Sequence, residues 1–264
     1  MQISQIPIIN YHKIDKVRDV GITTRHPDDF RHDMEIIRDN GYETITFTDL
    51  NSGSPLPAKP LIITFDDGYE SVFNYAVPVM KEMKLRGVIF VLAEFMGKYN
   101  DWDVQFGDKR FRHMETGQIK ELMRDGFEIG SHTCSHRLLT AIGINELLRE
   151  IKQSKLLLEN LLMTDIISVS YPFGRFDKDV LKLTRDTGYI FGVSLVNFKK
   201  IDPEWEQLTL KRHNIYRFDG VRALMKKISG DRHRPLELRD SLIQKGGLAT
   251  AVYQKLIKKN LKLT

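Results

Sequence analysis

Several features are scarce or missing in this sequence, and each absence narrows the class of protein. The 264 residues include one cysteine, Cys134, so an internal disulfide is excluded and the redox compartment stays open. No apolar stretch approaches the ~20 residues that a membrane-spanning helix needs. The opening MQISQIPIIN has neither a basic region nor a long apolar run, so we expect a cytoplasmic protein without a signal peptide.

Linkers, repeats and low-complexity runs are also missing, so nothing in the sequence divides the chain. Hydrophobic residues make up 41% and charged residues 28%, as in an ordinary globular protein. The net charge of +5 suits an anionic partner, but no cluster of basic and aromatic residues accompanies it. We therefore expect no nucleic-acid partner. The sequence does not show the oligomeric state.

Strand-like and helix-like segments alternate along the chain. Runs rich in β-branched and aromatic residues predict strands at 6–10, 42–46, 61–65, 87–93, 127–131, 165–170, 189–195 and near 208–216. The helical patterns between them are expected to end at glycine, the usual left-handed C-terminal cap, at Gly41, Gly87, Gly126 and Gly188. Strict alternation of this kind predicts an α/β fold with a parallel sheet closed into a barrel, and an open doubly wound sheet is the main alternative.

Polar or turn-forming residues follow four of these predicted strands. In a parallel barrel the functional site lies at the carboxyl ends of the strands, so we expect these residues on one rim. They are His12, the pair Asp66 and Asp67, the pair His132 and His136, and the segment 171–174.

Two adjacent aspartates end the strand predicted at 61–65. Successive side chains of a strand point to opposite faces, so Asp66 and Asp67 should face different directions. Taken alone, the pair is equally typical of an Asp-Gly turn preceded by a solvated acid.

The motif SHTCSH places His132 and His136 four residues apart. On a helical turn, this spacing puts both rings on one face, where they can reach the same ion. Two imidazoles and one carboxylate, with positions left for water, are typical of catalytic zinc and related divalent sites. With Asp67 as the third ligand, Asp66 is left unligated, in a position that suits a general base. The alternative is a pair of helix-start histidines capped by Ser131.

TFDDG at 64–68, SHTCSH and YPFG together resemble the polysaccharide deacetylases of carbohydrate esterase family four, over nearly the whole chain up to about Gly230. The opening IPIINYHKI further resembles the branch that de-N-acetylates poly-N-acetylglucosamine. The resemblance implies a single-domain, distorted barrel of about seven β/α units at residues 1–230. It also implies metal-dependent de-N-acetylation of an N-acetylated glycan. One divalent ion is expected, with Zn²⁺ first and Co²⁺ or Ni²⁺ as alternatives.

Carried over residue by residue, the resemblance makes Asp66 the base and Asp67, His132 and His136 the metal ligands. Phe173 stands where the family usually has tyrosine, and that position offers its backbone N–H to the oxyanion. The substrate-binding candidates are Phe173, Tyr171 and Arg212.

Two roles remain open between pairs of residues. Ser170 stands where many members carry an arginine that orients the base, and Arg175 or Arg212 can replace it. The general acid is His12 in the branch with YH near the start, and a late-strand histidine, here His213, in many other members. We favour His12 because it falls at the carboxyl end of a strand.

Two further residues near the motifs have a structural and a functional interpretation. Cys134 can bind a soft metal, but its position between the two histidines predicts a small buried side chain instead. Trp102 follows the fourth strand together with Asp101, Asp103 and Phe106. It can stack on a sugar ring or serve as a packing anchor.

Residues 231–264 form a basic extension that we expect to be helical and to pack on or beside the barrel. Within it, 236–263 combines apolar spacing with four lysines near the end, so contact with the inner face of a membrane is a second interpretation. Gly246 and Gly247 interrupt this helix and favour packing. Two rival functions also stay open, a hydrolase acting on a small amide and an inactive, metal-retaining glycan-binding protein.

Overall fold

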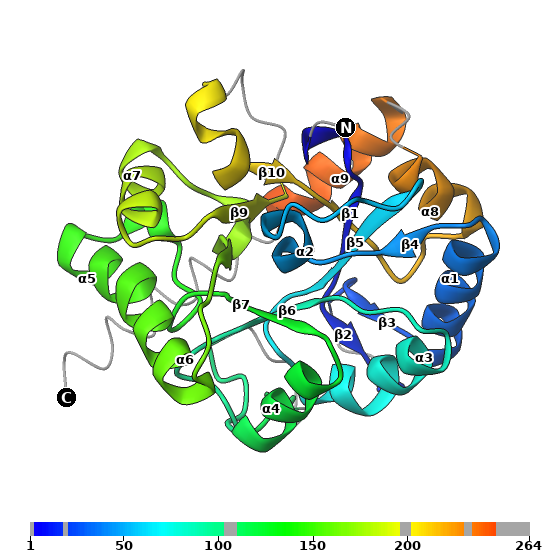
Figure 1. Cartoon of the computed structure of the whole chain (residues 1–264), viewed down its shortest axis with the longest axis horizontal. Coiled ribbons are helices and arrows are strands. Elements are labelled where there is room, and N and C mark those ends of the chain that lie inside the picture. Colours follow the sequence, from blue (N-terminus) through cyan, green and yellow to red (C-terminus); the bar gives the residue numbers. More distant parts are fainter. Residues whose placement is uncertain (1–2, 18–20, 103–109, 196–201, 230–233, 247–264) are drawn as a thin grey trace.

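The computed structural model describes residues 3–17, 21–102, 110–195, 202–229 and 234–246. Its main sheet is parallel, with strand order β10-β9-β8-β7-β6-β5-β1-β11 (Figure 1). The strands are β1 (Ile8–Tyr11), β5 (Pro60–Phe65), β6 (Val88–Val91), β7 (Glu128–Ser131), β8 (Ser168–Ser170), β9 (Phe191–Ser194), β10 (Leu210–Lys211) and β11 (His213–Asn214). β4 (Glu43–Thr44) pairs with the start of β5, and β2 (Lys13–Ile14) pairs with β3 (Thr24–Arg25).

The sheet closes through one extended segment that is interrupted at Arg212. β10 pairs with β9, and β11 pairs with β1, so this segment connects the last long strand of the sheet, β9, to the first, β1. An open doubly wound sheet has no such bridge. The predicted distorted barrel of about seven β/α units is confirmed.

Most of the helices surround the barrel as an outer layer, while α2 lies over its interior (Figure 1). The helices are α1 (Pro27–Asp39), α2 (Phe47–Asn51), α3 (Val77–Glu82), α4 (Thr116–Arg124), α5 (Ile144–Leu148), α6 (Ser154–Leu162), α7 (Lys178–Asp186), α8 (Val221–Ile228) and α9 (Arg234–Gly246). Short 3-10 or π segments are Ile3–Gln5, Val72–Ala76, Leu139–Ala141, Arg149–Gln153, Pro172–Gly174 and Pro203–Leu208.

The glycine caps were predicted correctly at three of the four helix ends. Gly41, Gly126 and Gly188 have positive φ angles of 75°, 85° and 90°. The prediction for Gly87 is wrong, because α3 ends five residues earlier and Lys84 takes the left-handed conformation there with φ 57°. Gly87 instead lies beside β5, where a Cβ atom would come within 2.7 Å of the Ile63 carbonyl oxygen.

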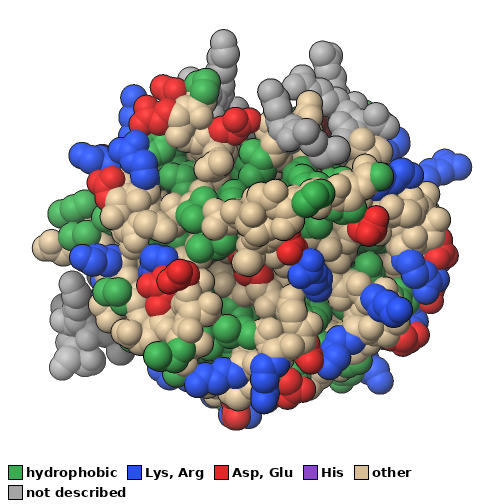
Figure 2. Space-filling view, viewed as in Figure 1, with side chains coloured by type: hydrophobic (Ala, Val, Ile, Leu, Met, Phe, Trp, Pro, Cys, Tyr) green, Lys and Arg blue, Asp and Glu red, His purple; other side chains and the backbone are tan. Residues whose placement is uncertain are grey.

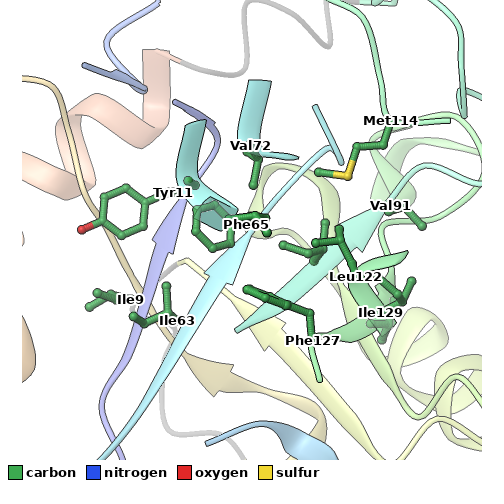
Figure 3. Close-up of a cluster of buried hydrophobic side chains, with 14 of the residues drawn as sticks. Ile9, Tyr11, Ile63, Phe65, Val72, Val91, Met114, Leu122, Phe127 and Ile129 are labelled. Atoms are coloured by element: carbon green, nitrogen blue, oxygen red, sulfur yellow. The ribbon is translucent and has the colours of Figure 1, made fainter. Parts of the chain in front are cut away.

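Strand alternation separates two hydrophobic clusters. Outward-facing residues of the strands pack against the helices in the larger cluster, part of which Figure 3 shows. It includes Ile9, Tyr11, Ile63, Phe65, Val91 and Ile129. Inward-facing residues at the amino ends of the strands form the smaller cluster, which includes Ile8, Ile62, Val88, Phe90, Phe191 and Leu210.

The amino end of the barrel is closed by α2. A capping box between Thr46 and Asp49 begins this helix and aims Phe47 into the smaller cluster. The Phe47 ring is fully buried and stacks on Phe191 at 5.2 Å between centroids. Glu128 of β7 accepts a hydrogen bond of 2.7 Å from the backbone N–H of Thr48, which holds α2 in place.

The described part of the C-terminal extension packs beside the barrel. Asp219 accepts hydrogen bonds from Lys227 of α8 at 2.6 Å and from Arg239 of α9 at 2.7 Å. The domain boundary near residue 230 stays a prediction. The lysine-rich part of the proposed membrane segment lies outside the described residues, in 247–264.

Surface charge is mixed on the face that Figure 2 shows. Lysine and arginine side chains alternate with aspartate and glutamate around its periphery. Among the described residues, the helices are all too short or too polar to cross a membrane.

Candidate metal centre and catalytic site

The two adjacent aspartates face different partners, as predicted. Asp66 continues β5, donates its N–H to the Tyr11 carbonyl at 3.0 Å, and points into the barrel. The chain then turns sharply, with φ 70° at Asp67 and 66° at Gly68. Only glycine fits at the second position, because a Cβ atom there would lie 2.9 Å from Cγ1 of Val91. The turn swings the Asp67 carboxylate toward the histidines.

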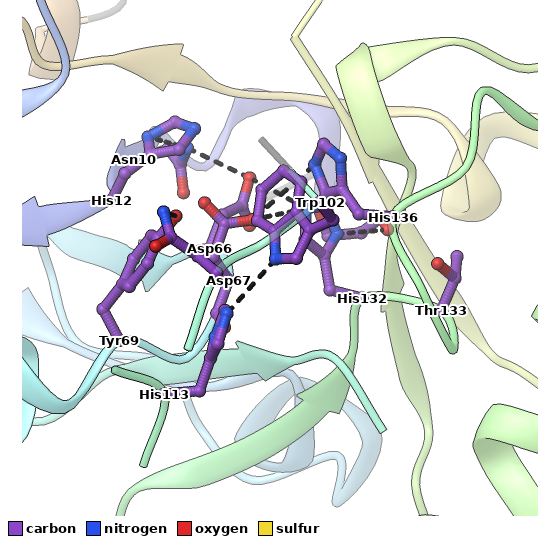
Figure 4. A network of polar contacts seen from close by, with 12 residues as sticks. Asn10, His12, Asp66, Asp67, Tyr69, Trp102, His113, His132, Thr133 and His136 are labelled. Atoms are coloured by element: carbon purple, nitrogen blue, oxygen red, sulfur yellow. Dashed lines mark hydrogen bonds and ion pairs between the residues drawn. The ribbon is translucent and has the colours of Figure 1, made fainter. Parts of the chain in front are cut away.

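Asp67, His132 and His136 converge on one point (Figure 4). Oδ1 of Asp67 lies 3.4 Å from Nε2 of His132 and 3.6 Å from Nε2 of His136. Ligands about 2.0–2.1 Å from a tetrahedral ion stand about 3.3 Å apart, so these separations fit one divalent ion. Oδ1 is buried and lacks a hydrogen-bond partner among the described residues. A cation would supply the partner that this oxygen lacks.

His132 is held in the tautomer that a metal site needs. Its Nδ1–H donates to the Ser170 carbonyl at 2.8 Å, which leaves the Nε2 lone pair directed at Asp67. Burial would lower the pKa of His132, but the charges of Asp66 and Asp67 raise it overall. Burial lowers the pKa of His136 to about 3, so its ring is neutral at ordinary pH. Burial opposes ionisation of Asp67, yet the two histidines hold its pKa well below the usual range.

The SHTCSH motif does not form the helical turn that its spacing suggested. Thr133 and His136 have φ angles of 70° and 56°, so the segment is an irregular loop. The buried carboxylate of Glu150 shapes this loop by accepting hydrogen bonds from the N–H groups of Cys134 at 3.0 Å and Ser135 at 2.9 Å. Glu150 belongs to the π-helical turn Arg149–Gln153, an irregularity that is frequent near functional sites.

Cys134 is a buried structural residue, as predicted. Its side chain is fully buried, and Sγ donates to the Arg149 carbonyl at 3.3 Å. Burial raises the pKa of the thiol to about 12, so the thiolate that would bind a metal is disfavoured.

Of the two candidate arginines, the structure places Arg212 on Asp66. Nη1 lies 2.8 Å from Oδ1 of Asp66, and Nη2 contacts Oδ2 in a bidentate pair. Nη2 also donates to Oγ of Ser170 at 2.6 Å, so the small serine leaves the space that this guanidinium occupies. Burial would raise the pKa of Asp66, but the charge and hydrogen bonds of Arg212, together with the charges of His132 and His12, lower it overall. Asp66 is therefore held as a carboxylate.

A buried amide network supports this pair, and sequence reasoning missed it. Oδ1 of Asn10 accepts hydrogen bonds from Arg212 and from Thr64, both at 2.8 Å. Nδ2 of Asn10 donates to Oδ1 of Asn214 at 2.8 Å and to Asp66 at 3.3 Å. Strand alternation was the available signal, because it directs Asn10 and Thr64 to the same interior face as Ile8 and Ile62.

His12 lies at the site and His213 does not. His12 is half-buried at the end of β1, and in Figure 4 it flanks Asp66 from the side opposite His132 and His136. Burial lowers its pKa, while the nearby charges of Asp67 and Asp66 act to raise it. His213 is in register with Ile9, on the outer face of the barrel. Burial and two neighbouring lysines lower its pKa to about 4.

Aromatic rings flank His136 on two sides. The Trp102 ring stacks on it at 4.1 Å and 30°, and the Phe173 ring meets it edge-on at 4.7 Å. Trp102 therefore serves as a packing anchor; Asp103 and Phe106 of the same loop lie outside the described residues. The phenol of Tyr171 is not brought to the site. Alternation after Ser170 turns it outward, where it packs against Phe176 in the larger cluster.

Backbone strain is concentrated at this site. Six described residues other than glycine have positive φ, and four of them are Asp67, Thr133, His136 and Phe173. Each such conformation costs about 1–3 kcal/mol and persists only where the surroundings enforce it. The geometry of the centre is thus imposed by the fold.

Comparison with known proteins places this chain among deacetylases. A family model described as polysaccharide deacetylase matches residues 53–192, just over half of the chain. The protein YxkH of Bacillus subtilis is 29% identical over 195 residues, 72% of this chain and 64% of the relative. The poly-beta-1,6-N-acetyl-D-glucosamine N-deacetylase of Escherichia coli is 27% identical over 134 residues, 47% of this chain and 20% of the relative.

A solved structure agrees with these matches. A polysaccharide deacetylase from Bacillus cereus is 28% identical with a TM-score of 0.70, over 84% of this chain and 68% of that chain. The chain spans less than two thirds of the length of the two curated relatives above, 64% and 20%. The family match, the barrel fold and the geometry of the site agree: this chain belongs to the polysaccharide deacetylase family.

Proposed function

We propose that this chain hydrolyses the N-acetyl group of an amino sugar in a glycan, with one divalent ion held by Asp67, His132 and His136. The observation that carries the proposal is the separate environment of Asp66. It lies beside the ligand group, 4.0 Å from Nε2 of His132, yet Arg212 holds it as a carboxylate. A glycan-binding protein has no need of such a base. The name of the Escherichia coli relative supports the choice of an N-acetylated amino sugar.

The chain's own residues supply the proton transfers of this reaction. Asp66 accepts a proton from the attacking water, and Arg212 and Asn10 keep its carboxylate in position. The backbone N–H of Phe173 donates to the carbonyl oxygen as negative charge develops there. His12, on the other side of Asp66, gives a proton to the leaving amine.

The donor set supports zinc as the first choice of metal. Two imidazole nitrogens and one carboxylate oxygen match catalytic zinc sites, and Co²⁺ and Ni²⁺ are the alternatives. When bound, such an ion lowers the pKa of water and polarises a carbonyl group.

An assay of acetate release tests the proposal. Purified protein is incubated with N-acetylglucosamine oligomers, and in parallel with small acetamides, with and without added Zn²⁺, Co²⁺ or Ni²⁺. We expect mass loss of acetyl groups from the oligomers, abolished by chelation. Asp66→Asn should lower turnover by about 10²–10⁴-fold, the usual contribution of a general base.

Each other outcome has a definite meaning. Turnover of small acetamides alone would identify a small-amide hydrolase. Glycan binding without turnover under every metal condition would contradict the proposal and favour the binding protein.

A further inference from the structure

A third buried histidine, His113, lies directly behind the metal centre. Residues 112–114 run antiparallel to the turn that follows Asp67, with a bridge between Tyr69 and His113. The N–H of Met114 donates to the Gly68 carbonyl at 2.8 Å. This pairing fixes His113, which is 2% exposed, against the backbone of the Asp67 turn.

The hydrogen bonds of His113 define one tautomer. Nδ1 lies 2.7 Å from the Asp67 carbonyl oxygen, which can only accept, so Nδ1 carries the proton. Nε2 lies 3.2 Å from Nε1 of Trp102, which can only donate, so Nε2 accepts. Figure 4 shows the indole directed at the imidazole. A neutral ring with a proton on Nδ1 satisfies both bonds.

These two bonds connect His113 to two of the three metal ligands. One holds the peptide carbonyl of Asp67, whose left-handed φ of 70° is unfavourable for a residue with a side chain. The other holds Trp102, whose ring stacks on His136 at 4.1 Å. A single imidazole therefore restrains the carboxylate ligand from behind and the histidine ligand through the indole.

We propose that His113 is a positioning residue of the metal centre, which sets the placement of Asp67 directly and that of His136 through Trp102. The inference rests on the metal site of the proposed function. Partners that orient a ligand typically contribute 10–100-fold to metal affinity. A purely structural role, such as the stacking of His113 on Tyr69 at 4.9 Å, would leave that affinity unchanged once the protein is folded.

Two substitutions separate the two hydrogen bonds. His113→Asn places an amide near Nδ1, so it keeps the donor to Asp67 and gives up the acceptor for Trp102. His113→Gln reaches the position of Nε2, so it keeps the acceptor and gives up the donor. His213→Asn, which replaces a half-buried histidine on the outer face of the barrel, is the control for a histidine substitution away from the metal centre.

The test is equilibrium titration of the full chain with Zn²⁺ against a chromophoric chelator. Trp102 and Trp205 are the two tryptophans, so a Trp205→Phe background makes Trp102 emission a local reporter of His136. We expect His113→Gln to weaken Zn²⁺ binding by about 10–100-fold. His113→Asn should retain most of the affinity but lose most of the Trp102 response, and His213→Asn should match the wild type.

Failure of this inference and of the metal site can be told apart. If the wild type binds one Zn²⁺ and both His113 variants bind it equally well with an unchanged Trp102 response, the positioning role is refuted alone. If the wild type binds no Zn²⁺, Co²⁺ or Ni²⁺, the metal site is refuted and this role with it. Should His113→Gln not fold, as judged by circular dichroism, His113→Asn carries the test through its Trp102 response. An unchanged response on Zn²⁺ addition would then overturn the link to His136 through Trp102.

Discussion

The two ends of the barrel are built from the same strands in opposite ways. At the amino end, Phe47 of α2 fills the interior and packs on Phe191 and Phe90, both buried and apolar. At the carboxyl end, the same alternation directs Asp66 and His132 inward, with left-handed backbone at the turns that follow. The first arrangement is an apolar cluster, and the second is charged and has four of the six left-handed residues other than glycine described in this chain.

Arg212 lies at the boundary between the two ends. Its guanidinium stands 5.5 Å above the Phe90 ring, and its Nη atoms bond to Asp66 on the other side. The guanidinium is buried against an apolar ring, where water does not solvate its charge. The Asp66 carboxylate compensates this charge as an ion pair. The ion pair with Arg212 thereby favours the ionised state of the base at the polar end. We therefore expect the amino end to contribute mainly to stability and the carboxyl end mainly to function. Arg212 is the side chain that contacts both.

The largest effect that should separate the two ends comes from Phe47→Ala. Removing this buried ring leaves a cavity, and we expect a loss of about 3–5 kcal/mol in the free energy of unfolding. Zn²⁺ affinity of the folded protein should stay at the wild-type value. Urea denaturation and metal titration measure the two quantities, with Phe47→Leu as the milder control. Loss of affinity without loss of stability would break the division between the ends.

A second prediction compares two histidines on paired strands. His12→Ala should reduce the rate of deacetylation by about 100-fold, which is the lower limit of the usual contribution of a general acid or base. Zn²⁺ binding should be retained. His213→Ala should stay near wild-type turnover, because its ring lies on the outer face of β11. Rates measured at saturating metal distinguish the two. The assignment of the acid would be overturned if His213→Ala were the slower enzyme.

The strands of the barrel and the main residues of the site could be predicted from the sequence, because local hydrophobic pattern and position at the end of a strand determine them. Asp66, Asp67 and the histidine pair were predicted because each follows an apolar run at the carboxyl end of a strand. Their tertiary supports could not be predicted in this way. Glu150 lies in the middle of a helical pattern, and the hydrogen bonds that it accepts override the helical turn expected at SHTCSH.

Other errors have equally local causes. Gly87 was mistaken for a helix cap, whereas close approach to the Ile63 carbonyl is what requires glycine there. Tyr171 was expected at the site, but one step past Ser170 the strand alternation turns its side chain outward. Polar residues in strands, such as Asn10, look solvent-exposed until the barrel closes around them.

The smallest predicted effect is the change in stability with pH that is due to His213, on the outer face of the barrel. Burial, with Lys211 and Lys227 nearby, lowers the pKa of His213 to about 4, although Asp240 and Glu237 partly oppose this. A depressed folded-state pKa contributes stability above the unfolded value of about 6.5, which is lost as pH falls toward 4. The loss should be about 1–2 kcal/mol, because His213 is partly exposed and solvent screens the charges.

His213→Asn isolates this contribution. Urea denaturation of the variant and of the wild type at pH 7.5 and pH 4.5 gives the change in stability with pH for each. The variant should lose less stability on acidification, since all other groups titrate alike in both. Identical losses would show that His213 is not responsible.

The central claim is that Asp67 holds the metal while its neighbour Asp66 does not. Zn²⁺ titration of the wild type, Asp66→Asn and Asp67→Asn at neutral pH tests this claim most directly. We predict one ion per chain for the wild type and for Asp66→Asn, with dissociation constants within roughly tenfold of each other. Asp67→Asn should bind more than about 100-fold more weakly, since it lacks a direct ligand. Equal loss of binding in both variants would contradict the account.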